Sequence, residues 1–140
     1  MVVPQPARER LAGVFAQSLA ERDPDATDAQ LAQAREKAFR APLLVLAVVR
    51  VADAAVEEIP AVERFISAGC AIQNALLVAT ALGYGSALTS GQALRSGALR
   101  ALFGLQPWEE AACFISFGTP ARRPRSVDRP ELESFVSILD

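Results

Sequence analysis

The feature that most constrains this chain is a long stretch without charge. Residues 65–83, within "PAVERFISAGCAIQNALLVATALGYG", contain no acidic or basic side chain. Pro60 suits the first turn of a helix, Glu63 suits its N-terminal dipole, and Gly83 can end it. Apolar positions surround the axis of this predicted helix, so we expect it to be buried on every side.

The same run is long enough to cross a membrane. However, no Lys/Arg cluster follows it, and polar residues interrupt it at Ser67, Gln73, Asn74 and Thr80. The small residues at 67–71 would let another helix approach closely. We therefore favour a helix buried in a homodimer interface, with Gly69, Gln73 and Leu76 at or near the contact, over a membrane span.

The length and charge of the chain limit its organisation and partners. With 140 residues and 51% hydrophobic content, it can form one modest core, so we expect a single domain over residues 1–140. A net charge of −2 provides no basic field for nucleic acid or an anionic membrane. The start, "MVVPQPARER", lacks the pattern of a signal peptide, which favours the cytoplasm.

The chain contains no histidine, and this excludes Ser-His-Asp, Cys-His and zinc-histidine chemistry. Cys70 and Cys113 stand far apart in apolar surroundings, so we interpret both as core residues of a protein from a reducing compartment. No metal site and no catalytic side chain are predicted.

The remaining segments predict an α+β fold. Residues 7–21 favour an amphipathic helix with Leu11 inside and Arg8 toward water, and a largely solvated helix follows Thr27 or Asp28. Strands are expected at 41–51, as a central strand covered on both sides, and at 111–118, while residues 86–90 predict a short strand or an extended loop. A short helix should end near Gly104. The tail segment "FVSIL" could add a strand or form an arm across a partner.

The segment "GYGSALTSG", residues 83–91, places glycines, a tyrosine and three hydroxyls where the long helix ends. Backbone amides and hydroxyls at such a point could hydrogen-bond a flat polar ring or a ribityl chain. A tight turn with hydroxyls facing solvent is the alternative, and composition alone favours it.

The order of three segments adds a resemblance. "FRAPLLVLAVV", "SAGCAIQNALLVATALGYGSALTSG" and "CFISFGTP" together resemble the nitroreductase family of flavin-dependent oxidoreductases, in its compact YdjA-like branch. The resemblance implies a nitroreductase-like fold, with a central sheet flanked by helices and the long helix buried at a homodimer interface. It also implies FMN and NAD(P)H as cofactors and a small-molecule electron acceptor, nitroaromatic or quinone-like.

The resemblance also implies where the cofactors lie. Leu88, Thr89 and Ser90 match positions against the isoalloxazine of FMN, although the branch often has tryptophan and a basic residue at the first two. Nicotinamide nucleotide would lie near the end of the helix, at Val78, Ala79, Thr80, Ala81, Leu82 and Gly83.

Other family members begin with a helical region whose Arg-rich, Ser-containing motif holds the FMN phosphate. We therefore expect a domain that is N-terminally truncated relative to the family. Arg122 and Arg123 could supply replacement charge, or they could belong to a solvated basic tail. Two hypotheses follow: an FMN-dependent NAD(P)H oxidoreductase, or a non-catalytic dimerisation module, a remnant without a competent FMN site.

Overall fold

The computed structural model describes residues 1–52, 59–121 and 128–139. The chain forms four helices, three strands and three short 3-10 turns in this part. In order they are α1 (Gln5–Arg22), α2 (Asp28–Glu36), η1 (Lys37–Phe39), β1 (Leu43–Arg50), α3 (Ala61–Ala81), β2 (Gly85–Thr89), η2 (Gln92–Arg95), α4 (Gly97–Phe103), β3 (Glu109–Gly118) and η3 (Leu132–Ser134). The predicted helices and strands are thus confirmed, with ends that differ by a few residues.

The three strands form one antiparallel sheet in the order β1-β3-β2. The expectation that residues 41–51 form its central strand is wrong, because β3 pairs with both of the others. The second edge of β1 is lined by the extended N-terminal residues, where the Val3 amide donates to the Leu44 carbonyl at 2.8 Å. Non-local pairing of this kind leaves no periodic signal in either segment.

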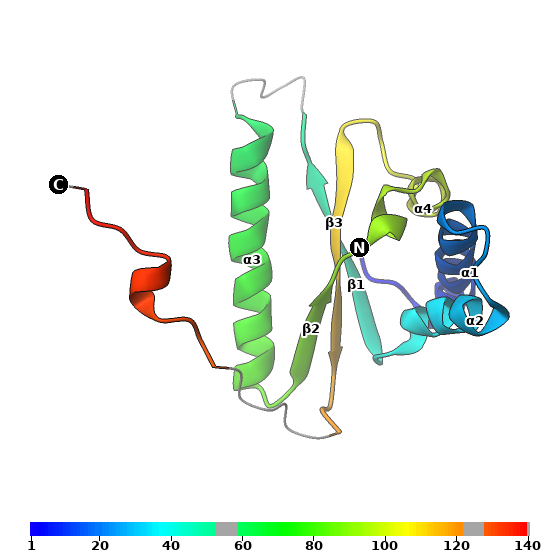
Figure 1. Ribbon diagram of the computed structural model, residues 1–140, viewed down its shortest axis with the longest axis horizontal. Coiled ribbons are helices and arrows are strands. Elements are labelled where there is room, and N and C mark those ends of the chain that lie inside the picture. The colour runs from blue at the N-terminus through cyan, green and yellow to red at the C-terminus, as the bar shows by residue number, and fades with distance from the viewer. Residues whose placement is uncertain (53–58, 122–127, 140) are drawn as a thin grey trace.

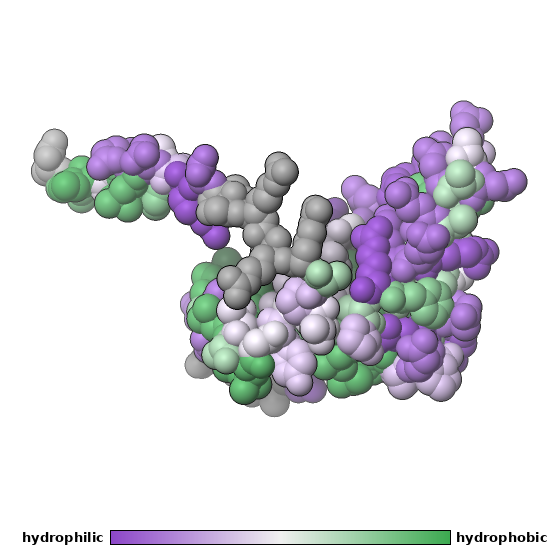
Figure 2. Space-filling view, turned by 90° about the horizontal axis from the view of Figure 1, so that it is seen from below, coloured by the Kyte–Doolittle hydropathy of each residue, from purple (hydrophilic) through white to green (hydrophobic). Residues whose placement is uncertain are grey.

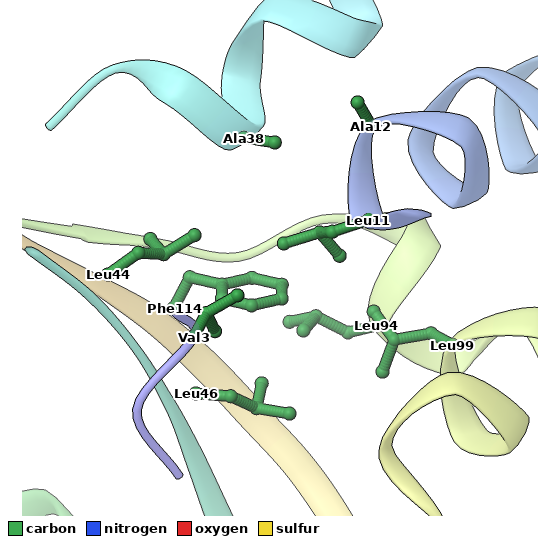
Figure 3. Packing of buried hydrophobic residues seen from close by; sticks show 9 residues of the cluster. All are labelled: Val3, Leu11, Ala12, Ala38, Leu44, Leu46, Leu94, Leu99 and Phe114. Carbon is green, nitrogen blue, oxygen red and sulfur yellow. The ribbon is translucent and has the colours of Figure 1, made fainter. Parts of the chain in front are cut away.

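Helices cover both faces of the sheet, as Figure 1 shows: α3 lies on one face, and α1, α2 and α4 lie on the other. The core lies on the second face, where Leu11, Leu46 and Leu99 are fully buried. Figure 3 shows Phe114 of β3 among these residues, and its ring meets that of Phe15 edge-on at 5.6 Å between centroids. The sheet and α1 therefore share one continuous apolar layer.

The predicted helix signals act as expected. The Thr27 hydroxyl oxygen accepts from the Gln30 backbone N–H, and Oε1 of the Gln30 side chain accepts from the Thr27 backbone N–H, which forms a capping box at the start of α2. At the end of α3, the Tyr84 amide donates to the Ala79 carbonyl at 2.8 Å, and Gly83 has φ of 82°. This is a Schellman motif, and it turns the chain directly into β2.

Within one chain, α3 is not buried on every side. Its sheet-facing stripe runs through Ala68, Ile72, Leu76 and Ala79, whereas Gly69 and Gln73 are exposed. The outward residues include Val62, Phe65, Ile66, Leu77, Val78 and Leu82, all more than 40% exposed. Among the described residues, only α3 is long and apolar enough to cross a membrane by length and composition. Its complete burial would require a partner.

Two further expectations are wrong. Arg8 is only 3% exposed, and its two terminal guanidinium nitrogens donate to the carbonyls of Ala38, Ala41 and Pro42 in place of water. Cys70 lies on the exposed side of α3, while Cys113 is buried in β3, as predicted. The error for Arg8 comes from its contacts with a distant segment, whereas Cys70 lies on a side of α3 that the single chain leaves exposed.

The tail extends away from the body beyond α3 (Figure 1), and Figure 2 shows hydrophobic side chains along it. Phe135, Ile138 and Leu139 are 64%, 89% and 98% exposed. Residues 128–139 contain no strand, so the added strand that "FVSIL" could form is not made with this chain's own sheet. Its role as an arm across a partner stays a prediction.

Candidate functional site

A pocket of about 510 Å³ lies beside the end of β2, on the face of the sheet that carries α1. Its walls come from α1, the end of α2 with η1, the strands β1 and β3, and the corner between β2 and η2. This volume falls within the range of small-molecule and cofactor sites. The pocket is therefore the candidate functional site.

The floor of the pocket is apolar and rigid. Leu44, Leu94 and Phe114 belong to the buried core shown in Figure 3, and Phe15 and Leu19 of α1 extend the same surface. Because the core packs these side chains from behind, the floor is preformed. A flat ring could lie against it without opening the core.

Two of the predicted site residues line this pocket: Thr89, the last residue of β2, and Ser90, which follows it. Pairing with β3 stops at Thr89 opposite Phe114, so the chain leaves the sheet beside the apolar floor. Both residues are exposed and present hydroxyl groups that can donate and accept. Leu88 does not line the pocket, since successive residues of a strand point to opposite faces.

Sequence reasoning missed three cations that line the pocket. Arg22 ends α1, Lys37 follows α2, and Arg40 lies just before β1. By composition, the segment that carries Lys37 and Arg40 looks like the solvated face of a helix. The signal that distinguishes these two residues is their position next to the turn where the helix runs into the apolar strand.

The other predicted site residues lie elsewhere. Residues 78–83 form the end of α3 and do not line the pocket. These residues precede the start of β2, whereas Thr89 is its last residue. The four residue steps from Gly85 to Thr89 span about 14 Å, so residues 78–83 and Thr89 lie at opposite ends of the strand. Arg122 and Arg123 lie outside the described residues.

The buried cysteine of β3, Cys113, offers no thiolate for chemistry. Burial raises the pKa of the Cys113 thiol above its ordinary value, so this thiol stays protonated at neutral pH. Among the described residues, no three His, Cys, Asp or Glu side chains gather as metal ligands. The pocket can thus bind and orient a ligand, but the described residues that line it include no His, Cys, Asp or Glu to act as a general base or nucleophile.

Residues 1–119 match the model of the nitroreductase family. The chain belongs to the nitroreductase family. It is 30% identical to the protein YdjA of Escherichia coli strain K12 over 139 residues, which cover 99% of this chain and 74% of that protein. The resemblance drawn from the sequence is therefore confirmed.

Solved nitroreductase structures share the fold. A nitroreductase-like family protein from Bacillus cereus superposes with a TM-score of 0.79 at 16% identity, over 99% of this chain and 71% of its own. The FMN-dependent nitroreductase NfnB from Mycobacterium smegmatis, solved in complex with NADPH, gives 0.67 at 18% identity, over 100% and 78%. At these identities the likeness concerns the fold, and it confirms the nitroreductase-like architecture.

Proposed function

We propose that this nitroreductase-family chain binds FMN in the pocket beside Thr89 and Ser90 and serves as an NAD(P)H-dependent oxidoreductase. The observation that carries the proposal is the meeting of two predicted flavin contacts with a preformed apolar floor. The acceptor would be a small planar molecule of the nitroaromatic or quinone class.

The chemistry of the pocket fits a flavin. The isoalloxazine is flat and largely apolar with a polar edge, and the floor at Phe114 and Leu94 lies next to the hydroxyls of Thr89 and Ser90. FMN also carries a phosphate, and cationic side chains line the same pocket. When bound, the flavin supplies the hydride and electron transfer.

The residues of this chain would bind and orient the flavin and its partners. Thr89 and Ser90 would hydrogen-bond the polar edge of the ring, and the packed floor would keep water from one of its faces. No side-chain acid or base is required for this role, which agrees with the absence of histidine. For direct transfer the nicotinamide must also reach the ring, so a nucleotide held at residues 78–83 would have to extend along β2.

The exposed face of α3 supports a homodimer. Its outward side chains, together with Tyr84 at 54% exposure, form an apolar surface beside the sheet. Figure 2 shows hydrophilic side chains gathered over the side of α1 and α2 and hydrophobic ones toward α3. Such a surface on a single chain is typical of an interface. The alternative function, a dimerisation module without a competent flavin site, depends only on this apolar surface and not on the pocket.

A flavin titration separates the two functions. The double variant Thr89→Ala, Ser90→Ala removes hydrogen bonds of about 0.5–1.5 kcal/mol each, so FMN should bind about one to two orders of magnitude more weakly. Ser86→Ala, on the same strand but outside the pocket lining, is the matched control. Quenching of flavin fluorescence measures binding, and oxidation of NADPH with a nitroaromatic measures activity. A dimer that neither binds FMN nor oxidises NADPH would leave the dimerisation module as the function.

A further inference from the structure

The core layer contains one buried charge, the guanidinium of Arg8 in α1. Its partners among the described residues are three backbone carbonyls rather than a carboxylate. Its Nε has no hydrogen-bond partner in the described part of the chain. Removing a guanidinium from water has a large free-energy cost, and an N–H left unpaired adds to that cost. Packing alone would therefore favour an apolar side chain at this position.

The three carbonyls belong to the segment that forms one wall of the candidate pocket. Arg8 donates to the Ala38 carbonyl at 3.4 Å, to the Ala41 carbonyl and to the Pro42 carbonyl at 2.8 Å. The residues of this segment that line the pocket alternate along the chain with those that Arg8 binds, and they are Lys37, Arg40 and Leu44. The bonds thus hold the backbone of the wall between the side chains that a ligand would meet.

The helix that carries Arg8 forms another wall of the same pocket. Phe15, Ser18, Leu19 and Arg22 of α1 line it. Phe15 follows Arg8 by two helical turns, or about 10.5 Å along the axis. One side chain therefore joins two walls of the pocket. Because its donors form a planar, rigid fork, three bonds from it leave little freedom in the distance between the walls.

The wall formed by residues 34–44 has few other anchors at its helical end. Ala34 is the buried residue of α2, and Ala38 is that of η1. An alanine side chain buries little apolar area, so each contributes little to holding the segment against the body. Within the described residues, the bonds of Arg8 are the side-chain hydrogen bonds that join this wall to α1.

We propose that Arg8 is a positioning residue, which fixes the wall at residues 34–44 against α1 and so sets the width of the pocket. Arg8 does not line the pocket, so it acts through the wall and not on the ligand itself. A wall that is already in place loses less entropy when a ligand binds. The inference rests on the proposed function for the identity of the ligand, FMN, whereas the order of the wall can be measured without it.

A pair of variants separates positioning from stability. Arg8→Met keeps an unbranched side chain and removes every donor. Ile115→Ala is the destabilised control, because Ile115 is buried on the face of β3 opposite Phe114 and outside the pocket lining. Fluorescence quenching measures FMN binding at a temperature where circular dichroism finds each chain folded. We expect Arg8→Met to bind FMN about 10-fold more weakly and Ile115→Ala to stay within about twofold of the parent.

Two further variants keep the test independent of folding. Gly13→Ala, added to Arg8→Met, should raise stability without restoring the bonds, since a Cβ at Gly13 meets no neighbouring atom within 4 Å. Arg8→Lys keeps the charge but lacks the fork, and it takes the place of Arg8→Met if that chain does not fold. The same loss of FMN binding is expected in both.

Hydrogen exchange provides a readout that needs no flavin. Without the bonds of Arg8, the amides of residues 37–41 should exchange about 10-fold faster while those of β3 keep their rate, because the wall opens locally. Ile115→Ala should instead speed exchange in β3 itself.

Each outcome decides the role of Arg8. Weaker FMN binding, with faster exchange confined to residues 37–41, supports the positioning role. FMN binding that stays unchanged in Arg8→Met, or that recovers when Gly13→Ala restores stability, overturns it and leaves the proposed function standing. If the parent binds no FMN, the proposed function fails and exchange decides alone. Faster exchange confined to the wall then supports the role of Arg8, and exchange that rises evenly along the chain overturns it.

Discussion

Gly118 packs directly against the ring of Pro42: a Cβ on Gly118 would lie 2.7 Å from Cδ of Pro42. The contact joins the end of β3 to the entrance of β1, just where Arg8 binds the Pro42 carbonyl. Three segments far apart in the sequence thus meet at one corner of the sheet.

Gly118→Ala should therefore destabilise the protein, because neither the strand nor the proline ring can yield easily. We expect a loss of about 1–3 kcal/mol in the free energy of unfolding, as for overpacking in a core. Chemical denaturation measures it. Gly97→Ala is the control, since a Cβ at that position would meet no neighbouring atom within 4 Å, and it should change stability little. Equal effects of both substitutions would contradict the packing role of Gly118.

A second pair of glycines tests the end of α3. Gly83 has φ of 82°, where an alanine costs about 1–2 kcal/mol, so Gly83→Ala should lower the midpoint of thermal unfolding. Gly13 lies inside α1 with open space around it, and Gly13→Ala should stabilise by about 0.4–1 kcal/mol. The same substitution, glycine to alanine, should therefore destabilise the protein at position 83 and stabilise it at position 13. A Gly83→Ala variant as stable as the parent would mean that the left-handed turn is not what Gly83 provides.

Much of this architecture could be predicted from local signals. The capping box at Thr27, the glycine turn at Gly83 and the apolar run of β1 all act through neighbours in the sequence, and each element formed as expected. The order of the strands and the burial of Arg8 depend on contacts across tens of residues. A single sequence contains no record of such contacts.

The residues of the candidate site also fall into two groups, those that the sequence could predict and those that it could not. Thr89 and Ser90 could be assigned because a recognisable segment carries them, and the structure places both on the pocket. The three cations come from separate elements that meet only in the folded chain. Leu88, which the resemblance implies lies against the same ring, does not line this pocket, and its role stays a prediction.

The buried thiol predicts a pH dependence of stability. Burial raises the pKa of Cys113 in the folded state, whereas an unfolded thiol titrates near its ordinary value of about 8.5. The unfolded chain then loses its proton first as the pH rises. The stabilising contribution is complete below about pH 8.5 and is lost as the pH rises through the folded pKa.

Chemical denaturation between about pH 7 and pH 10 measures how steeply the free energy of unfolding declines as the pH rises. Cys113→Ala should flatten it, and Cys70→Ala, which removes an exposed thiol, should leave it unchanged. An equally steep decline in the Cys113→Ala variant would assign the pH dependence to other groups.

Cys70 can report on the proposed dimer. It lies on the exposed side of α3, so in a single chain it should react with iodoacetamide as fast as a free thiol. If α3 pairs with a second copy, the reaction should slow as the protein concentration rises. Phe65→Asp places a charge on the same apolar surface and should restore the fast reaction.

Light scattering must accompany this labelling. A dimer whose Cys70 still reacts rapidly would place the interface elsewhere on the molecule. Cys113 serves as the internal control, because it should remain slow in either state.

The position of β3 at the centre of the sheet has a consequence for synthesis on the ribosome. Arg50 pairs with Glu109 and Leu43 with Phe117, so β1 gains its partner strand only as β3 is translated; β2, whose Gly85 pairs with Gly118, completes its pairing only at the last residue of β3. Domains generally fold as units while the chain is made, at about 5–20 residues per second. β1 and β2 therefore lack their partner strand for seconds, and a nascent chain that pauses before Glu109 presents both apolar strands to chaperones or to neighbouring copies.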